Sequence, residues 1–311
     1  MDYATPRTRI NRPQVAIQFQ SRSSCPICNG GNAGNLCELA CTDERLKSFL
    51  ETFYHGRVDE SLIKTGTYRV VQCLQCDFIY QQEILNDAGM EALYGDWVDQ
   101  EQSLNKKQNA KAALYRQYSG QILTLQRLFP GPPGKTRVLE YGMGWGYWSR
   151  MAQAHGFDVS GYELSCQRIQ HAKNMGLNVI NELPPPGQVY HFIFANQVFE
   201  HLPDPRQTLE SLCDRLTVDG VVCIRVPDGR GVVDKLKQRG WSPQLEAIHP
   251  LEHINCFTRD TLIRLAAETR LKPFNPPLRL NWGSVWGGLK REIADRFFTT
   301  HLYFKHQESA S

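Results

Sequence analysis

The chain has 311 residues, 41% of them hydrophobic, so it is long enough for one large domain beside a smaller one and can bury a substantial core. Its 35 basic and 32 acidic residues give a net charge of +3, which argues against a strong field for nucleic acid or an anionic membrane. No apolar run approaches the length of a membrane span, and the first residues lack the apolar centre of a signal peptide. We therefore expect a cytoplasmic protein with no membrane partner.

The amino-terminal part predicts an arm followed by a small lobe. Residues 1–20 are polar and contain prolines, and we expect a flexible arm. Residues 21–100 contain "TYRVVQC" and "DFIYQQ", which predict two short strands around a cysteine turn. Between the cysteines, "DERLKSFLETFYHG" has Leu46, Phe49, Leu50 and Phe53 at helical spacing, which predicts an inserted helix.

Two CxxC pairs occur in this lobe, "CPIC" with Cys25 and Cys28 and "CLQC" with Cys73 and Cys76. Each pair can present two thiolates to one tetrahedral Zn²⁺, so the four cysteines predict a closed structural zinc site in an amino-terminal zinc-binding domain. The alternative is four buried or redox-active cysteines without a metal. Cys37 and Cys41 are competing ligands, and we interpret them as packing residues on or beside the inserted helix.

The rest of the chain predicts a larger α/β domain. Residues 101–134 carry a helical pattern that ends in a run of Pro and Gly, and we expect a bridging helix and linker. Residues 135–285 alternate strand and helix patterns, which is typical of a Rossmann-like, doubly wound parallel sheet. Residues 286–311 predict a carboxyl-terminal helix and tail, which we expect to dock on the domain; capping of the acceptor pocket and pairing with another subunit are the alternatives.

The stretch "LEYGMGWGYW" follows the first predicted strand of that domain with Gly142, Gly144 and Gly146. Glycines in this turn allow positive φ and close approach of the backbone to a ligand. A dinucleotide site requires a small residue where Tyr147 stands, which argues against a bound pyrophosphate. Glu163 ends the second predicted strand, where an acid can accept hydrogen bonds from both ribose hydroxyls of an adenosine. Glu140 can orient a cationic amino-acid group.

These elements resemble the class I S-adenosylmethionine-dependent methyltransferases over roughly residues 137–272. The first motif of that family is similar to "VLEYGMGWG", its ribose acid to Glu163, and a further hallmark to "NQVFEHLPDP". The resemblance implies an enzyme that binds S-adenosylmethionine, with Glu140 near the amino-acid end and Asn181 and Glu182 beside the adenine. It also implies that the following residues line the cofactor: Gly142, Gly144, Gly146 and Asn196.

Methyl transfer from a sulfonium requires an aligned acceptor and removal of its proton, so candidate bases are sought in loops at the carboxyl ends of strands. "FEHLPDP" offers His201, and "IHPLEHINCF" offers His249, Glu252 and His253. Adjacent residues of an extended chain point to different sides, so we expect Glu252 to hold a neighbour rather than His253 itself. We interpret His249 as a packing residue, and a satisfied histidine before a helix is the alternative for His253.

Together with the four-cysteine lobe, "EHLPDP" and "HPLEHINCF" resemble the zinc-containing sugar methyltransferases that act on nucleotide-linked keto-deoxysugars. This resemblance implies that His253 is the base and that His201 and Glu252 hold the sugar, with methylation at carbon or oxygen. Tyr94 and Trp97 are candidates for a lid or for packing at the lobe junction.

Two other functions remain open at this stage. An RNA methyltransferase would grip nucleic acid with the lobe, but residues 25–76 contain five basic residues against six acidic ones, so we do not expect a nucleic-acid partner. A binding module that has lost catalysis is the other alternative, against which the intact glycine turn and Glu163 argue. The sequence predicts a small-molecule acceptor and leaves the oligomeric state undefined.

Overall fold

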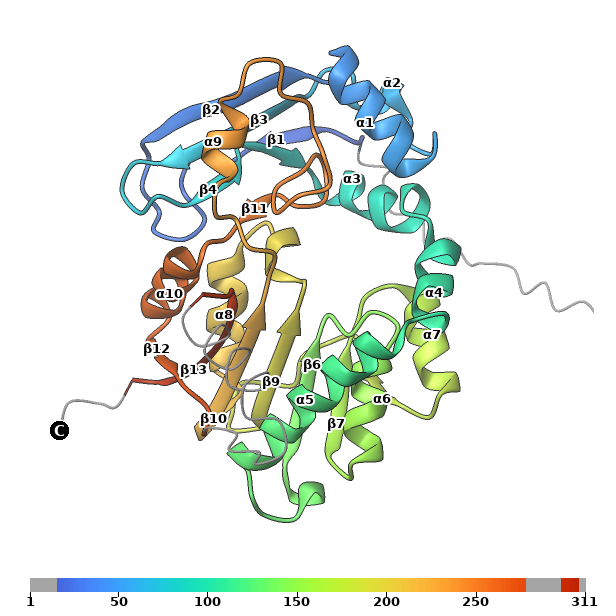
Figure 1. Ribbon diagram of the computed structural model, residues 1–311, viewed down its shortest axis with the longest axis vertical. Helices are drawn as coiled ribbons and strands as arrows, with labels where there is room; N and C mark the ends of the chain where they lie inside the picture. Colours follow the sequence, from blue (N-terminus) through green and yellow to red (C-terminus); the bar gives the residue numbers. More distant parts are fainter. Residues whose placement is uncertain (1–15, 278–297, 308–311) are drawn as a thin grey trace, which may run out of the picture.

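The computed structural model describes residues 16–277 and 298–307, which form an amino-terminal lobe next to a larger sheet domain (Figure 1). Residues 1–15 of the predicted arm and residues 286–297 of the predicted carboxyl-terminal helix lie outside these ranges. Of the helices within them, none combines the length and apolar character needed to cross a membrane.

A seven-stranded sheet forms the larger domain, in the order β12-β13-β10-β9-β6-β7-β8. Strands β8, β7, β6, β9 and β10 are parallel neighbours, and β13 runs antiparallel to both β10 and β12. The five parallel strands confirm the predicted Rossmann-like α/β fold, but the antiparallel β13 makes the sheet mixed rather than fully parallel. The strands are β6 (Arg137–Tyr141), β7 (Asp158–Tyr162), β8 (Asn178–Ile180), β9 (Tyr190–Asn196), β10 (Leu216–Arg225), β12 (Leu271–Phe274) and β13 (His301–His306).

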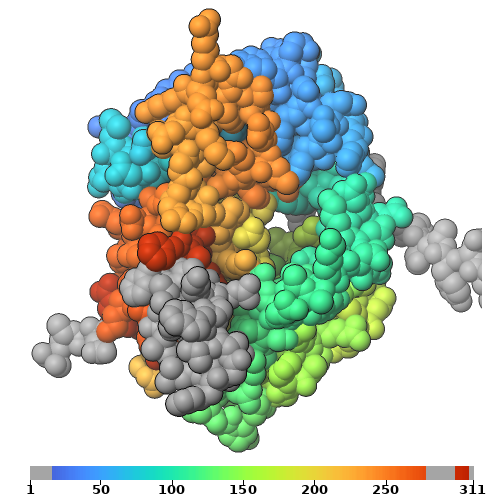
Figure 2. Space-filling model, in the orientation of Figure 1, coloured from blue at the N-terminus to red at the C-terminus, as the bar shows by residue number. Residues whose placement is uncertain are grey.

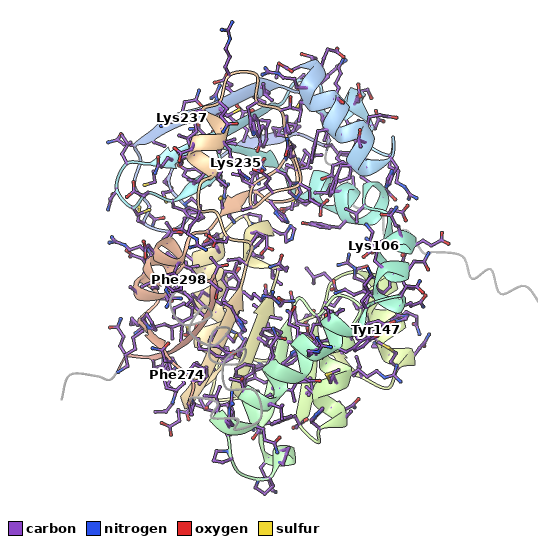
Figure 3. The ribbon with its side chains drawn as sticks, viewed as in Figure 1. Lys106, Tyr147, Lys235, Lys237, Phe274 and Phe298 are labelled. Carbon is purple, nitrogen blue, oxygen red and sulfur yellow. The ribbon has the colours of Figure 1, made fainter. Side chains whose placement is uncertain are left out.

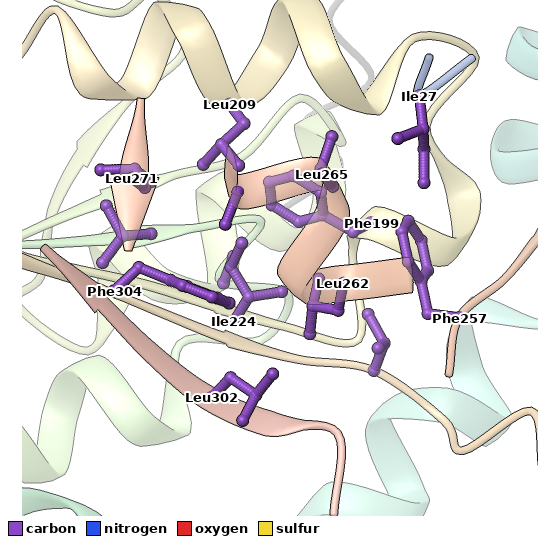
Figure 4. Packing of buried hydrophobic residues seen from close by; sticks show 14 of the residues in the cluster. Ile27, Phe199, Leu209, Ile224, Phe257, Leu262, Leu265, Leu271, Leu302 and Phe304 are labelled. Atoms are coloured by element: carbon purple, nitrogen blue, oxygen red, sulfur yellow. The ribbon is translucent and has the colours of Figure 1, made fainter. Parts of the chain in front are cut away.

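Helices cover both faces of this sheet. Successive residues of a strand point to opposite faces, so the apolar strands present side chains to helices on both sides. Val138 and Phe192 pack with α5 and α6 on one face, whereas Leu139 and Ile193 pack with α8 and α10 on the other. Figure 4 shows the second face, where Leu209 of α8 and the α10 leucines meet strand residues. The helices are α5 (Ala112–Leu128), α6 (Tyr147–Ala154), α7 (Cys166–Asn174), α8 (Pro205–Cys213) and α10 (Arg259–Glu268), with short turns η2 (Pro133–Lys135) and η3 (Phe199–His201).

The lobe contains an antiparallel sheet in the order β11-β4-β3-β2, and a separate ribbon of β1 with β5. Helix α1 is the predicted inserted helix. The Asp43 side chain caps it by accepting a hydrogen bond from the Arg45 N–H, and His55 ends it in the left-handed conformation. The elements are β1 (Phe19–Ser21), β2 (Ala33–Ala40), β3 (Thr67–Cys73), β4 (Ile79–Gln81), β5 (Glu83–Leu85), β11 (Asn255–Cys256), α1 (Glu44–Tyr54), α2 (Glu60–Ile63) and α3 (Asp87–Ala92).

Strand β2 is an element that the sequence analysis did not predict. It contains Cys37, which therefore lies on a strand rather than on the inserted helix, and Cys41 follows the strand just before α1. Both cysteines contact the core that α1 forms with the lobe sheet, in agreement with a packing role. β-Branched and aromatic residues are few in "AGNLCELA", which is why strand propensity gave no signal here.

The chain crosses between the two parts more often than the sequence indicated. The bridging region is two helices, α4 (Gln100–Gln108) and α5, preceded by the π-helical turn η1 (Leu93–Trp97). After β10 the chain returns to the lobe, where α9 (Val232–Leu236) packs near β2 and β11 pairs with β4 (Figure 1). Residues 301–306 of the predicted tail form β13 between β10 and β12.

Candidate functional site

The glycine turn lies where the strand order reverses between β6 and β9, which is the position where open α/β sheets bind ligands. Gly142, Gly144 and Gly146 all have positive φ, of +71°, +56° and +75°. A Cβ on Gly142 would come within 2.6 Å of Val198, and one on Gly146 equally close to Leu177. A Cβ on Gly144 would meet no protein atom within 4 Å. Two glycines are therefore required by packing, and Gly144 borders open space.

Glu163 connects this turn to the segment after β7. Its Oε2 accepts the Gly144 N–H at 2.9 Å, and its Oε1 accepts the N–H groups of Leu164 and Ser165 at 2.8 and 2.9 Å. A carboxylate has about four lone-pair positions, so about one is left for a ligand hydroxyl while the Gly144 bond persists. Arg168 lies 3.9 Å from the same Oε2.

The other predicted cofactor residues lie around the same edge of the sheet. Glu140 is 5% exposed, and its Oε2 accepts the N–H and hydroxyl of Ser149 at the start of α6. Burial raises the pKa of Glu140 to about 8, although the Ser149 hydrogen bonds oppose this shift. Asn181 and Glu182 are exposed and directly follow β8. Asn196 ends β9, and its buried Oδ1 has no hydrogen-bond partner among the described residues.

Three loops bring titratable side chains together on the side of the sheet that faces the lobe. His201 stands on η3 after β9, and His253 lies in the loop before β11, yet their rings are 4.8 Å apart in a T-shaped arrangement. Tyr94 of η1 reaches the same place, with its hydroxyl 3.1 Å from His201 Nδ1. Trp97 is instead buried in the lobe core, so of the two aromatic candidates only Tyr94 contacts the site.

Backbone carbonyls fix the orientation of both imidazoles. His201 Nδ1 is 2.9 Å from the Glu252 carbonyl oxygen, and His253 Nδ1 is 2.9 Å from that of Glu246. Because a carbonyl only accepts hydrogen bonds, each neutral ring carries its proton on Nδ1 and has its lone pair on Nε2. The Glu252 backbone carbonyl thus orients His201, whereas the Glu252 side chain forms a hydrogen bond with Tyr54.

Glu200 is a member of this group that the sequence analysis missed. It is fully buried, and its Oε1 lies 4.0 Å from His201 Nε2. One oxygen of Glu200 and one ring nitrogen each of His201 and His253 lie within 4.8 Å of one another. We call these three residues the histidine–carboxylate cluster. Its only sequence signal is that Glu200 directly precedes His201 in "FEH".

Burial shifts the pKa values of the cluster in opposite directions. Desolvation disfavours the charged form of each group, so it lowers the pKa of His201 to about 3 and of His253 to about 4, and raises that of Glu200 to about 8. His253 adds to the lowering at His201. His249 is 1% exposed and packs against Phe49 and Phe53, which agrees with a packing role.

Figure 2 shows a hollow between the lobe and the sheet domain. Helix α4, which carries Lys106, lies on the side of this opening away from α9, which carries Lys235 (Figure 3). Ser103 of α4 accepts a hydrogen bond from Trp145 Nε1 in the glycine turn. Arg168 links the glycine turn to the histidine–carboxylate cluster, since it lies near Glu163 and its charge also lowers the pKa of His201.

The four predicted zinc ligands converge in the lobe. Their sulfur atoms all lie within 4.8 Å of one another, with Cys25 and Cys76 at 3.6 Å and Cys28 and Cys73 also at 3.6 Å. None is in a disulfide. Sulfurs around a tetrahedral Zn²⁺ at the usual bond length are about 3.8 Å apart. The donor set and its spacing fit a closed zinc site, and we refer to it as the four-cysteine cluster.

Comparison with known proteins identifies the family. Residues 113–272, just over half of the chain, match the methyltransferase domain family. No curated protein shows significant similarity to the chain. Among solved structures, the Burkholderia thailandensis 1,6-didemethyltoxoflavin N1-methyltransferase is 15% identical, with a TM-score of 0.45 over 74% of this chain and 94% of that one. The plantazolicin methyltransferase BpumL is 17% identical, with a TM-score of 0.48 over 70% and 93%.

The sheet order, the glycine turn at its reversal point and the family match over residues 113–272 agree with one another. The chain belongs to the methyltransferase domain family, in the class I group that takes the methyl group from S-adenosylmethionine. It is therefore an enzyme.

Proposed function

We propose that this methyltransferase acts on a small-molecule acceptor, a sugar or nucleotide-linked sugar that it methylates at carbon or oxygen. The observation that carries the proposal is the histidine–carboxylate cluster, which Arg168 connects to Glu163 beside the glycine turn. Val198, packed on Gly142, is only three residues before His201, so the acceptor side directly adjoins the cofactor side.

The residues present fit S-adenosylmethionine. Gly144 borders open space at the reversal point, and the unpartnered Oδ1 of Asn196 lies at the end of the adjacent strand. Gly142, Gly144 and Gly146 would line the methionine part, Glu163 the ribose, and Asn181 and Glu182 the adenine. Glu140 would act on the amino-acid end. When bound, the cofactor supplies an electrophilic methyl group.

The cluster supplies what the acceptor needs. We assign His253 as the base, because its ring is fixed by the Glu246 carbonyl and is neutral at physiological pH. His201 and Glu252 position the acceptor, and the Glu252 carbonyl fixes the His201 ring. Holding the acceptor in line with the methyl group turns an encounter into a unimolecular step.

We propose a structural Zn²⁺ bound by Cys25, Cys28, Cys73 and Cys76. Four thiolates leave no open coordination position, so the ion would hold the lobe together rather than take part in the reaction. The cluster joins β3 to the amino-terminal turn and lies within the same hydrophobic core as the sheet domain.

The surface of the lobe does not favour RNA as the acceptor. Arg69 pairs with Glu38 at 2.9 Å, Arg45 with Asp43 at 2.8 Å, and Arg57 with Asp99 at 2.8 Å. Basic side chains that are paired with carboxylates offer little net charge to phosphates. A small acceptor thus remains our proposal.

Mass spectrometry of reactions with S-adenosylmethionine tests this assignment. The panel contains nucleotide-linked sugars, free sugars, other small metabolites and total RNA. We expect one methyl group to be added to a sugar-containing acceptor. Methylation of RNA with no modified small molecule would overturn the proposed acceptor class, and binding of NAD without binding of S-adenosylmethionine would contradict the cofactor site.

A further inference from the structure

The histidine–carboxylate cluster contains hydrogen-bond acceptors without matching donors. Both imidazoles use Nδ1–H on backbone carbonyls and have only the Nε2 lone pair left. Neither side-chain oxygen of Glu200 has a partner from another residue in the part of the chain that the structure describes, although both oxygens are buried. An unpaired buried carboxyl costs free energy, so its retention needs an explanation.

The spacing of the cluster defines where a proton donor would bind. Three atoms that are no more than 4.8 Å apart leave a point within about 2.8 Å of each, which is an ordinary hydrogen-bond length. An acceptor O–H or C–H group placed there would face Glu200 as well as the two imidazoles. When Glu200 is ionised the cluster has lone pairs only, and methylation releases a proton that one of them can take.

We propose that Glu200 is a further catalytic residue, the group that finally takes the proton lost by the acceptor. This inference rests on the proposed function. The acceptor O–H or C–H bond breaks, its electron pair forms the new bond to the methyl carbon, and the S–CH₃ bond breaks with its electrons left on sulfur. The proton passes to an imidazole Nε2 and then to the Glu200 carboxylate, which becomes a neutral carboxylic acid.

The surroundings of Glu200 support this direction of transfer. An imidazolium at His253 or His201 would be a buried charge, as their lowered pKa values indicate, whereas a protonated Glu200 is neutral. The proton therefore moves downhill from either ring to Glu200, whose pKa burial raises to about 8. The titratable or charged groups that face the cluster from other elements are Tyr94, Glu252 and Arg168. Burial raises the pKa values of Tyr94 and Glu252, the charges of Glu252 and Glu200 add to the rise at Tyr94, and the charge of Arg168 opposes it at both residues.

Glu200→Gln tests the proposal, with Glu210→Gln on exposed α8 as the matched control and Glu200→Asp as the conservative variant. With the acceptor found by the panel, we expect Glu200→Gln to lower kcat at least about 100-fold, the lower range for a general base.

In the native enzyme kcat should rise with pH through about 8, because only the ionised carboxylate takes the proton. Glu200→Gln should lose this rise, Glu200→Asp should retain it, and Glu210→Gln should match the native enzyme.

Cofactor affinity by calorimetry and melting temperature separate this role from a folding defect. Both should be unchanged in Glu200→Gln, and normal turnover in that variant, or loss of turnover with the pH rise intact, would overturn the proposal. Failure of the native enzyme to bind S-adenosylmethionine would instead count against the proposed function.

Two measurements need no acceptor. Carbon-13 NMR of the full chain should show one glutamate carboxyl that titrates near 8 and is missing in Glu200→Gln. Titration only at the ordinary value of about 4.3 would overturn the role. Stoichiometric Mn²⁺ binding, measured by electron paramagnetic resonance and abolished by Glu200→Gln, would show that the cluster is a metal site and would also overturn it.

Discussion

The four-cysteine cluster and the histidine–carboxylate cluster are both assembled from segments far apart in the chain, but they differ in spacing and in surroundings. The cysteine sulfurs pair at 3.6 Å, near the separation in a zinc tetrahedron, whereas Glu200 and His201 are 4.0 Å apart. The cysteines lie within a continuous hydrophobic core, whereas His201 and His253 are half-buried and His201 contacts Tyr94.

This difference is the basis of our proposal that one cluster stabilises structure and the other performs chemistry. A closed set of four soft ligands satisfies its own members through one ion and needs no further partner. In the histidine–carboxylate cluster, an ionised Glu200 and two imidazole lone pairs have no donor until a proton arrives. Buried polar groups need bonding partners in both clusters. The cysteines can find theirs in one metal ion, whereas the histidines and Glu200 require a reacting molecule, and we therefore propose different functions for the two.

The largest effect that we expect comes from removing one cysteine. Cys73→Ser leaves three ligands, and because metal binding supplies folding free energy in such sites, the lobe should unfold. Native protein should contain about one zinc per chain by atomic emission, and the variant should contain much less. Cys37→Ser, on β2 outside the cluster, is the control and should keep its metal. A native protein that is metal-free yet equally stable would contradict the zinc site.

His253→Ala should have the next largest effect, on turnover alone. A general base contributes about 100-fold to 10,000-fold, so kcat should fall by at least the lower figure while cofactor affinity and melting temperature change little. His201→Ala should be milder if that residue only positions the acceptor. Normal turnover in His253→Ala together with loss in His201→Ala would exchange the two roles.

Local patterns predicted much of what each cluster contains, and long-range geometry accounts for the rest. CxxC spacing identified all four cysteines, because each pair is formed by one turn. Glu200 was missed, since nothing in "FEH" indicates that its carboxyl is buried and unpartnered. The sheet was predicted from alternating patterns, but β13 was not, because an antiparallel strand in a parallel sheet depends on pairing rather than on periodicity. Likewise, the position of Arg168 beside Glu163 was not predicted, because it depends on how α7 packs.

Glu163→Ala tests the cofactor site, with an intermediate effect. A hydrogen bond to a charged group contributes about 1.5–3 kcal/mol, and we expect S-adenosylmethionine binding to weaken by that amount. The variant also frees the Gly144 N–H, so its melting temperature should be measured in parallel. Gly144→Val should abolish binding, because its side chain would occupy the open space beside the turn and strain a positive φ. Unchanged affinity in both variants, measured by calorimetry, would refute the placement of the cofactor.

The smallest expected effect is on the pH dependence of the free energy of unfolding, which shows whether Glu200 is protonated or ionised at pH 7. Its pKa is raised by burial to about 8 in the folded state, above the ordinary value of about 4.3, so between these values the folded protein binds more protons than the unfolded chain. Stability from this group is fully present below the unfolded value and is lost as pH rises through about 8. The histidines do not contribute above pH 7, because they are then largely neutral in both states. Glu140, whose pKa burial also raises to about 8, adds a similar slope.

From pH 7 to pH 8 the native free energy of unfolding in urea should therefore fall, by at most about 1.4 kcal/mol for each of the two carboxyls. Glu200→Gln removes one of these contributions, so its pH dependence should be shallower than that of the native protein. Glu210→Gln, an exposed control, should keep the native slope. Because the four-cysteine cluster is intact in every variant, a slope that is equal in Glu200→Gln and the native protein would mean that Glu200 is already ionised at pH 7. The expected rise of kcat through about pH 8 would then have to come from a group other than Glu200.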